Sequence, residues 1–202
     1  MSRIIAGSAG GTRLATPTGD RTRPTTDRVR EALFSTLATW NGTADAGADA
    51  QLDGIAFCDL YAGSGGVGLE AASRGAGPVV LVEHDQQTAR LVKANIAKAH
   101  LRATVEAASV DTFLQRAGSS YDVIWLDPPY PFTNEQVAHT LGLALERLVH
   151  NGLIVLERSA RTDEPAFPAG TEHWSRTYGE TVLHYCQRVT DDTAEDELDE
   201  QE

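Results

Sequence analysis

The sequence predicts an α/β fold built on a doubly wound, mostly parallel sheet. Apolar runs of strand length alternate with segments of helical periodicity, and such fully apolar strands occur in parallel sheets that helices cover on both faces. Near the C-terminus two strand-like runs flank Gly179-Glu180, which predicts an antiparallel terminal hairpin. The length of 202 residues fits one domain with small appendages. A composition of 41% hydrophobic and 23% charged residues excludes a fibre or a mostly disordered chain.

The first segment is expected to form a small β-hairpin. Arg3–Ala6 and Thr12–Ala15 are strand-like, and the glycine-rich residues 7–11 between them suit a turn. A polar, arginine-rich connector follows at residues 18–23. The hairpin is too small and too polar to form a core, so residues 1–23 are expected to be a basic N-terminal region beside the main domain, residues 24–188.

The first helix of the main domain is expected to begin at residues 24–27. The stretch Pro24-Thr25-Thr26-Asp27 has the composition of a helix start, and apolar residues then recur at helical spacing. These apolar residues are Val29, Leu33, Phe34 and Leu37. Residues 41–53 are rich in Ala, Gly and Asp, and they are predicted to be a loop and the least ordered internal stretch.

The parallel sheet and its helices are expected from residue 55 onward. Five apolar runs have the length of strands, and they are Ile55–Tyr61, Pro78–Glu83, Ala103–Ala108, Tyr121–Leu126 and Gly152–Glu157. Four helical segments separate them, and these are Val67–Arg74, Gln87–Ala99, Val110–Arg116 and Glu135–Leu148. Thr133 and Gln136 have capping-box spacing at the start of the last helix. The terminal hairpin is expected to pair residues 171–178 with residues 181–187.

The charge of the chain is distributed unevenly. The net charge is −12, but residues 189–202 alone carry −8 with no Lys or Arg, so the remaining residues sum to −4. This acidic tail has no apolar periodicity and is predicted to be disordered. Residues 1–30 carry +4, which makes a nucleic-acid partner plausible despite the acidic total. Their arginines are Arg3, Arg13, Arg21, Arg23, Arg28 and Arg30.

Several classes of protein and site are disfavoured. Cys58 and Cys186 each lie in an apolar run, which predicts reduced, buried thiols and a cytoplasmic location. No apolar run approaches the roughly 20 residues of a membrane helix, and the N-terminus lacks the apolar region of a secretory signal. The histidines show no metal-ligand spacing. We therefore expect no membrane partner and no metal.

A glycine-rich loop marks the expected cofactor site, because ligands of such sheets bind beyond the carboxyl ends of the strands. Residues 63–68 match G-x-G-x-x-G between a strand and a helix, and Glu83 ends the next strand about 20 residues on. Asp59, just before the loop, opposes a dinucleotide pyrophosphate but complements the ammonium and sulfonium of S-adenosyl-L-methionine. The expected cofactor-binding residues are Asp59, Ala62, Gly63, Ser64, Gly65, Glu83, His84, Asp85, Ser109, Val110 and Asp127.

The loop Asp127-Pro128-Pro129-Tyr130 is the expected catalytic site. Two consecutive prolines offer carbonyl groups and no N–H groups, so the loop is rich in hydrogen-bond acceptors. The Asp127 carboxylate and the Pro128 carbonyl could accept both protons of an exocyclic base amine and direct its lone pair at a methyl group. Tyr130 could stack on a flipped-out base. Positioning and electrostatics would then supply most of the rate.

These motifs resemble those of class I amino-methyltransferases. The N-terminal stretches Arg3-Ile4-Ile5-Ala6-Gly7 and residues 23–34 further resemble the bacterial 16S rRNA guanine-N2 methyltransferases that modify guanine 966. The resemblance implies a Rossmann-like fold, S-adenosyl-L-methionine as cofactor, and 16S ribosomal RNA as partner, within a small-subunit particle. The concentration of six arginines in this small, polar segment predicts that they bind phosphates of the ribosomal RNA. The loop at residues 41–53 and the acidic tail depart from the family pattern, but neither touches the motifs.

Three other functions are compatible with parts of this pattern. A DNA adenine-N6 methyltransferase would use the same acceptor loop, although it normally has a separate recognition domain. An NAD-dependent oxidoreductase would use the glycine loop, but it offers no role for residues 127–130. A catalytically silent RNA-binding module would use the arginines alone.

Overall fold

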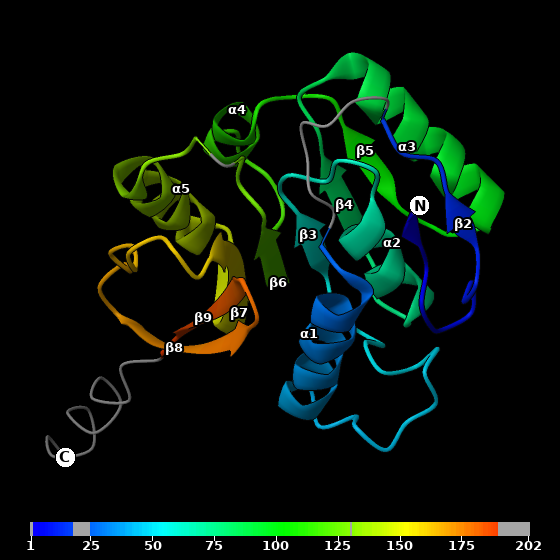
Figure 1. The fold of residues 1–202 in the computed structure, drawn as a ribbon, viewed down its shortest axis with the longest axis horizontal. Helices are drawn as coiled ribbons and strands as arrows, with labels where there is room; N and C mark the ends of the chain where they lie inside the picture. The colour runs from blue at the N-terminus through cyan, green and yellow to red at the C-terminus, as the bar shows by residue number, and fades with distance from the viewer. Residues whose placement is uncertain (1, 18–24, 130, 190–202) are drawn as a thin grey trace, which may run out of the picture.

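The computed structural model describes residues 2–17, 25–129 and 131–189 (Figure 1). Its main sheet has seven strands in the order β5-β4-β3-β6-β7-β9-β8. These strands are β3 (Phe57–Asp59), β4 (Val79–Val82), β5 (Thr104–Glu106), β6 (Tyr121–Leu126), β7 (Leu148–Ser159), β8 (Thr171–Tyr178) and β9 (Thr181–Arg188). The pairs from β5 to β7 are parallel, whereas β9 lies antiparallel to both β7 and β8. The predicted doubly wound sheet with an antiparallel terminal hairpin is confirmed.

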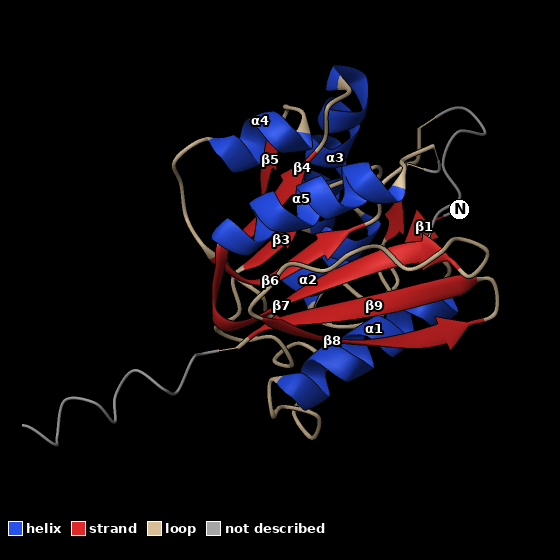
Figure 2. Ribbon diagram, turned by 90° about the vertical axis from the view of Figure 1, so that its left-hand side faces the viewer, coloured by secondary structure: helices blue, strands red, loops and turns tan. Residues whose placement is uncertain are grey.

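Helices cover both faces of this sheet. They are α1 (Asp27–Trp40), α2 (Gly66–Ser73), α3 (Gln86–Ala99), α4 (Val110–Gln115) and α5 (Asn134–Glu146). Apolar residues of α1, α2 and α3 join one buried cluster, and those of α4 and α5 join the other. Figure 2 shows α1 and α5 on opposite sides of the sheet.

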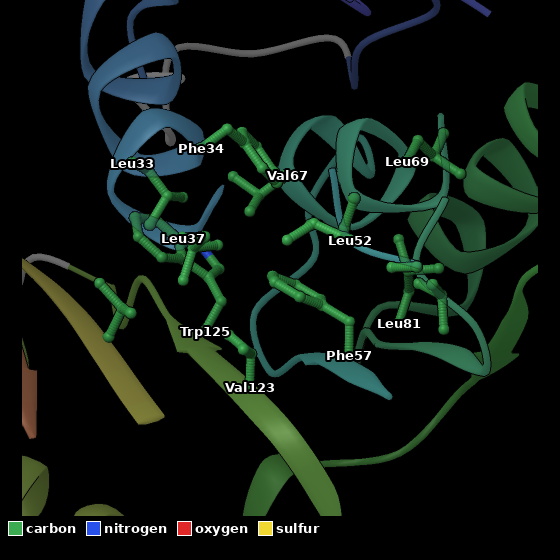
Figure 3. Close-up of a cluster of buried hydrophobic side chains, with 14 of the residues drawn as sticks. Leu33, Phe34, Leu37, Leu52, Phe57, Val67, Leu69, Leu81, Val123 and Trp125 are labelled. Carbon is green, nitrogen blue, oxygen red and sulfur yellow. The ribbon is translucent and has the colours of Figure 1, made fainter. Parts of the chain in front are cut away.

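The two clusters divide each strand between them because successive side chains of a strand point to opposite faces. In β6, Val123 and Trp125 face the α1 side (Figure 3), whereas Ile124 and Leu126 face the α5 side. This alternation explains why the strands are apolar throughout, and it also fixes the face on which each residue beyond a strand end lies.

Helix caps define the starts of α1 and α5. The Thr26 hydroxyl accepts a hydrogen bond from the Val29 N–H, so α1 begins at Asp27, within the predicted start at residues 24–27. Thr133 and Gln136 form the predicted capping box at the start of α5. Both local motifs therefore act as the sequence indicates.

The N-terminal hairpin packs on the main domain. Strand β1 (Ser2–Arg3) pairs with β2 (Arg13–Leu14), and the hairpin lies beside α2 and α3 (Figure 1). Ile4 and Leu14 are buried in the α1-side cluster, and the Glu70 carboxylate of α2 accepts the N–H of Ala6 at 3.0 Å. The hairpin thus contributes to the core, which its polar composition did not indicate.

The expectation of low order in residues 41–53 is wrong. The segment is a series of hydrogen-bonded turns, in which the Gln51 carbonyl accepts from the Asn41 side chain at 3.2 Å and from the Thr43 hydroxyl. Leu52 is fully buried, and its N–H donates to the Arg74 carbonyl at 2.9 Å. One buried leucine and satisfied backbone groups are enough to anchor a segment whose composition resembles a flexible loop.

Two further findings concern cysteines and membrane-spanning segments. Cys58 and Cys186 are free and buried, as expected. Among the residues that the structure describes, no helix combines the length and apolar character needed to span a bilayer. The expectations for Arg21, Arg23, Tyr130 and residues 190–202 lie outside the described residues.

Candidate active site

The glycine loop and the Asp127 loop meet where the strand order reverses. Strand β3 has β4 on one side and β6 on the other, both parallel to it. Asp59 is the last residue of β3, and Asp127 directly follows β6. The carboxyl ends of neighbouring parallel strands lie at the same sheet edge, so the two sequence motifs share one site.

Three glycines shape the loop after β3, for two different reasons. Gly63 and Gly65 have positive φ angles of 53° and 83°, which favour glycine. Gly68 lies inside α2, where a Cβ would stand 2.8 Å from a side-chain carbon of Leu81 in β4. The first two glycines turn the chain, and the third lets α2 pack closely on the sheet. The loop has the geometry expected of the fingerprint.

Asp59 lies beneath this loop, and one of its carboxylate oxygens accepts a hydrogen bond from the loop's helix. Its Oδ2 accepts the Gly68 N–H at 2.9 Å, whereas its buried Oδ1 has no hydrogen-bond partner among the described residues. Burial raises the pKa of Asp59 to about 7, the Gly68 N–H opposes this, and the Glu83 carboxylate adds to it. A cationic group beside Oδ1 would satisfy the oxygen and stabilise the carboxylate.

Glu83 connects the end of β4 to the glycine loop. Its Oε2 accepts the Gly63 N–H at 3.0 Å and its Oε1 accepts the Asp85 N–H at 2.8 Å. The side chain is therefore fixed, and each oxygen retains lone-pair capacity for a further donor such as a ribose hydroxyl. His84 Nδ1 lies 3.1 Å from Oε1, but the His84 side chain is mostly exposed.

Two other predicted cofactor residues cap helices. The Asp85 carboxylate accepts the Thr88 N–H at 2.7 Å, and this hydrogen bond lowers the pKa of Asp85. The Ser109 hydroxyl accepts the Thr112 N–H at 3.2 Å. Both side chains thus have a structural partner already, and their backbone groups remain the parts available to a ligand. Val110 is buried in the α5-side cluster.

The remaining predicted loop residues contribute mainly backbone groups. The Ala62 N–H donates to the Val82 carbonyl at 3.0 Å, which ties the loop to β4. The Ser64 carbonyl accepts from the Asn95 side chain at 2.9 Å. The same Asn95 side chain also bonds the backbone of Ala15, so α3 links the glycine loop to the N-terminal hairpin.

Asp127 lies in an acidic environment. Burial and the carboxylates of Glu157 and Asp59 raise the pKa of Asp127 well above its usual range, and the Arg158 guanidinium opposes them. Arg158 also donates to the Phe132 carbonyl at 3.1 Å. It therefore holds the end of the loop while offsetting part of the negative charge.

The two prolines differ in exposure. Pro128 is buried, and Pro129 is exposed with its carbonyl accepting the Phe132 N–H at 3.0 Å. Phe132 in turn makes an edge-to-face contact with Tyr61, with ring centroids 5.9 Å apart. The described part of the loop is therefore braced by a turn and by an aromatic contact from the glycine-loop side.

Glu157 is a site residue that sequence reasoning missed. It lies in β7 next to β6, and its Oε2 accepts the Thr25 hydroxyl at 2.8 Å. The contact joins residues 132 positions apart, so no local motif indicates it. Its position at the end of an apolar run is the same signal that identified Glu83.

One described cavity lies away from this edge of the sheet. Its volume is about 290 Å³, and its lining includes Phe113, Tyr121 and Arg147. The Arg147 guanidinium donates to the carbonyls of Ser119 and Arg116, at 2.8 and 3.1 Å, and stacks over the Phe113 ring. These contacts brace the loop between α4 and β6, so we assign the cavity no part in the chemistry.

Comparison with known proteins identifies the family. Residues 2–187 match the family described as conserved hypothetical protein 95. The chain belongs to this family. It is 33% identical over 190 residues to "Ribosomal RNA small subunit methyltransferase D" of Escherichia coli strain K12, covering 92% of this chain and 89% of that protein. The Haemophilus influenzae protein of the same name is 32% identical over 178 residues, or 86% of this chain and 84% of its own length.

A solved structure supports the same fold. The Escherichia coli protein yhhF aligns with a TM-score of 0.78 and 29% sequence identity, and the match covers 93% of this chain and 98% of that one. The Rossmann-like fold implied by the resemblance is confirmed. Within the described residues, no group of three or more His, Cys, Asp or Glu side chains is arranged to hold a metal ion.

The N-terminal arginines of this family member fall into two groups. Arg13 and Arg28 are exposed, and Arg3 is exposed while paired with Asp27 at 3.2 Å. Arg30 differs from the expectation of an RNA contact, because its side chain is only 2% exposed. It donates to Asp27 at 2.7 Å and to the Gly66 carbonyl at 3.1 Å. Arg30 therefore ties α1 to the glycine loop, and we exclude it from the RNA-binding set.

Proposed function

We propose that this chain transfers a methyl group from S-adenosyl-L-methionine to the exocyclic N2 amine of a guanine in 16S ribosomal RNA. The observation that carries the proposal is the meeting of two motifs at one sheet edge, Asp59 with the glycine loop on β3 and the Asp127 loop on β6. The names of the Escherichia coli and Haemophilus relatives support small-subunit ribosomal RNA as substrate. Guanine 966 follows from the resemblance of the N-terminal motifs.

The residues beside the glycine loop suit S-adenosyl-L-methionine. The buried Oδ1 of Asp59 has no hydrogen-bond partner within the part of the chain that the structure describes, so it calls for a cationic or hydrogen-donating group, and the ammonium of the cofactor is such a group. Glu83 would accept the ribose hydroxyls, and the backbone of Ala62, Gly63, Ser64 and Gly65 would line the amino-acid end. The exposed His84 and the backbone of Asp85, Ser109 and Val110 would border the adenosine. When bound, the cofactor supplies an electrophilic methyl group on a sulfonium.

The Asp127 loop would hold the amine for an in-line displacement. The carboxylate of Asp127 and the Pro128 carbonyl would accept hydrogen bonds from the two N2–H groups. This would direct the N2 lone pair at the methyl carbon. The lone pair would form the new nitrogen–carbon bond as the carbon–sulfur bond breaks, with the electron pair of that bond left on sulfur. The amine then loses one proton, which the ionised Asp127 carboxylate can take because its pKa is raised. Pro129 shapes the turn, and base stacking by Tyr130 stays a prediction.

The exposed N-terminal arginines would bind the RNA backbone. Arg3, Arg13 and Arg28 present positive charge at the end of the molecule where α1 and the hairpin meet the glycine loop. Phosphate contacts of this kind add affinity and orient the substrate without reading its sequence. Arg21 and Arg23 stay predicted RNA contacts. The free, buried thiols fit a cytoplasmic location, where this substrate is assembled.

One assay tests this function. The purified full-length protein is incubated with S-adenosyl-L-methionine carrying a labelled methyl group and with small subunits from cells that lack the resident methyltransferase. Free 16S ribosomal RNA and duplex DNA are tested in parallel, and the labelled nucleoside is identified by mass spectrometry. We expect N2-methylguanosine from a ribosomal substrate, with Asp127→Ala as the inactive control. Label in N6-methyladenosine of DNA, or in no nucleic acid, would overturn the proposal.

A further inference from the structure

Glu157 lies beside Asp127 on the same face of the sheet. The parallel register of β6 and β7 ends with Leu126 opposite Leu156, so Asp127 and Glu157 are the next pair. Neighbouring strands lie about 4.8 Å apart, and alternation places both side chains on the α1 face, with Trp125 and Val155. Thr25, just before α1, donates its hydroxyl to Glu157 at 2.8 Å from that same face. The geometry therefore brings two carboxylates side by side at the substrate end of the sheet.

Two adjacent carboxylates match the edge of guanine that carries the reacting amine. In guanine the N2 amine is next to a protonated N1, so this edge presents three N–H groups in a row. In adenine the corresponding N1 is unprotonated and is an acceptor. Enzymes that act on extruded bases read them by hydrogen bonds to this Watson–Crick edge. With the N2 protons held by Asp127 and the Pro128 carbonyl, the N1–H needs an acceptor on the neighbouring strand.

We infer that Glu157 accepts the N1–H of the target guanine and thereby makes the enzyme select guanine. The inference rests on the proposed function and names the residue that determines its base specificity. A carboxylate has about four lone-pair sites and can accept the N1–H alongside its existing contacts, of which the Thr25 hydroxyl is one. The Thr25 hydroxyl fixes the orientation of the carboxylate and thus its direction toward the base. A base with an unprotonated N1 would place its lone pair against this negative charge.

The charges around Asp127 add a second signature of the same arrangement. Among the described residues, the charged groups that act on Asp127 are Glu157 and Arg158 from β7 and Asp59 from β3. Because Glu157 helps to raise the pKa of Asp127, replacing it by a neutral residue should lower that pKa. The acid limb of the rate profile, where Asp127 loses its charge, should then move to lower pH. A residue with only a structural role would not shift this limb.

The test compares two bases in the full-length protein with its complete substrate. Small subunits are reconstituted with 16S ribosomal RNA that carries either guanine or 2-aminopurine at the target position. 2-Aminopurine keeps the N2 amine but has an unprotonated N1. The variant Glu157→Gln keeps a carbonyl oxygen for the Thr25 hydroxyl and adds an N–H donor. The matched control is Glu172→Gln, which removes the same charge from an exposed position of β8.

We expect the wild type to methylate guanine at least about 10-fold faster than 2-aminopurine, the scale of one charged hydrogen bond. Glu157→Gln should lose roughly 10–100-fold in kcat/KM on guanine and gain on 2-aminopurine, with unchanged affinity for S-adenosyl-L-methionine. Glu172→Gln should resemble the wild type on both bases.

Two different failures have different meanings. If the wild type methylates guanine but treats 2-aminopurine equally well, the role of Glu157 is overturned while the proposed function stands. The same holds if Glu157→Gln lowers both rates in parallel and leaves the acid limb in place. If the wild type methylates neither substrate, the proposed function itself is wrong.

Discussion

The two halves of the active site are held in different ways. At the ends of β3 and β4, Asp59 and Glu83 accept hydrogen bonds from backbone N–H groups that lie 2 to 20 positions away in sequence. At the ends of β6 and β7, Glu157 is held by a hydroxyl 132 positions away. Asp127 there faces two other carboxylates across the site, with Arg158 as its compensating charge.

This difference indicates that the two halves of the candidate site have different roles. The half with Asp59 and Glu83, which we propose binds the cofactor, is preorganised by its own backbone, so a ligand could bind there with little rearrangement. The substrate half holds like charges whose repulsion a hydrogen-donating base relieves. We therefore expect substitutions in the cofactor half to change affinity for S-adenosyl-L-methionine, and those in the substrate half to change turnover.

The largest effect is expected at Asp127. Asp127→Ala should lower turnover by about 100-fold or more, because one preorganised acceptor for the amine is lost. Asp127→Asn should retain more activity, since its amide oxygen still accepts. Single-turnover rates with saturating cofactor measure this, and calorimetry should show nearly unchanged binding of S-adenosyl-L-methionine. An equal loss of cofactor affinity would erase the distinction between the halves.

Glu83 should show the opposite pattern. Glu83→Ala should weaken S-adenosyl-L-methionine by roughly 1–3 kcal/mol, because charge-assisted hydrogen bonds to the ribose are lost. Turnover at saturating cofactor should change little. Calorimetry of the free protein is the measurement, with Glu172→Ala as the control, since that exposed glutamate lies in β8, away from the glycine loop. Unchanged affinity in Glu83→Ala would place the ribose elsewhere.

Asp59 should make cofactor binding depend on pH. Its pKa is about 7 in the free protein, and a bound ammonium would lower it, so binding releases a proton below pH 7. Affinity should therefore rise by up to about tenfold per pH unit below pH 7 and level off above it. Calorimetry in two buffers of different ionisation enthalpy counts the released proton. Asp59→Asn should abolish the dependence of cofactor affinity on pH. If the full dependence persists in this variant, another group is responsible for it.

The same group should affect the stability of the free protein with the opposite sign. The pKa of Asp59 is raised on folding, so the folded state holds a proton that the unfolded chain has lost. Its contribution to the free energy of unfolding is present below about pH 4 and declines as the pH rises to about 7. Urea denaturation at pH 5 and pH 8 should show a smaller decline for Asp59→Asn than for the wild type. Identical declines would mean that the Asp59 carboxyl is not the titrating group.

The smallest effects are expected at single exposed arginines. The slope of the logarithm of the binding constant for small subunits against the logarithm of the salt concentration counts phosphate contacts. Arg13→Ala and Arg28→Ala should each lower the magnitude of this slope by nearly one unit. Arg116→Ala is the control, since Arg116 is exposed at the end of α4 on the opposite side of the sheet. Binding measured at two salt concentrations decides the matter. Slopes that match the wild type would make Arg13 and Arg28 a solvated surface with no part in RNA binding.

The sequence alone was sufficient for the fold class and for the position of the glycine loop and Glu83 at the carboxyl ends of β3 and β4. The strand and helix pattern, the glycine loop and Glu83 depend on local periodicity and on contacts between nearby residues. The side chains of Asp85 and Ser109 show the limit of such reasoning, because both follow strands as predicted but their side chains cap helices.

What only the tertiary structure decided depends on distant contacts. Arg30 lies in a basic stretch, yet packing of α1 against α2 buries it on Asp27 and Gly66. Leu52 anchors the loop at residues 41–53, because its N–H donates a hydrogen bond to the carbonyl of the distant Arg74. Glu157 reaches Asp127 and Thr25 only through the register of β6 and β7 and the position of α1. Composition and spacing determined which chemistry the chain carries. Strand register and burial determined which charged groups face one another, because register and burial depend on contacts between residues far apart in sequence.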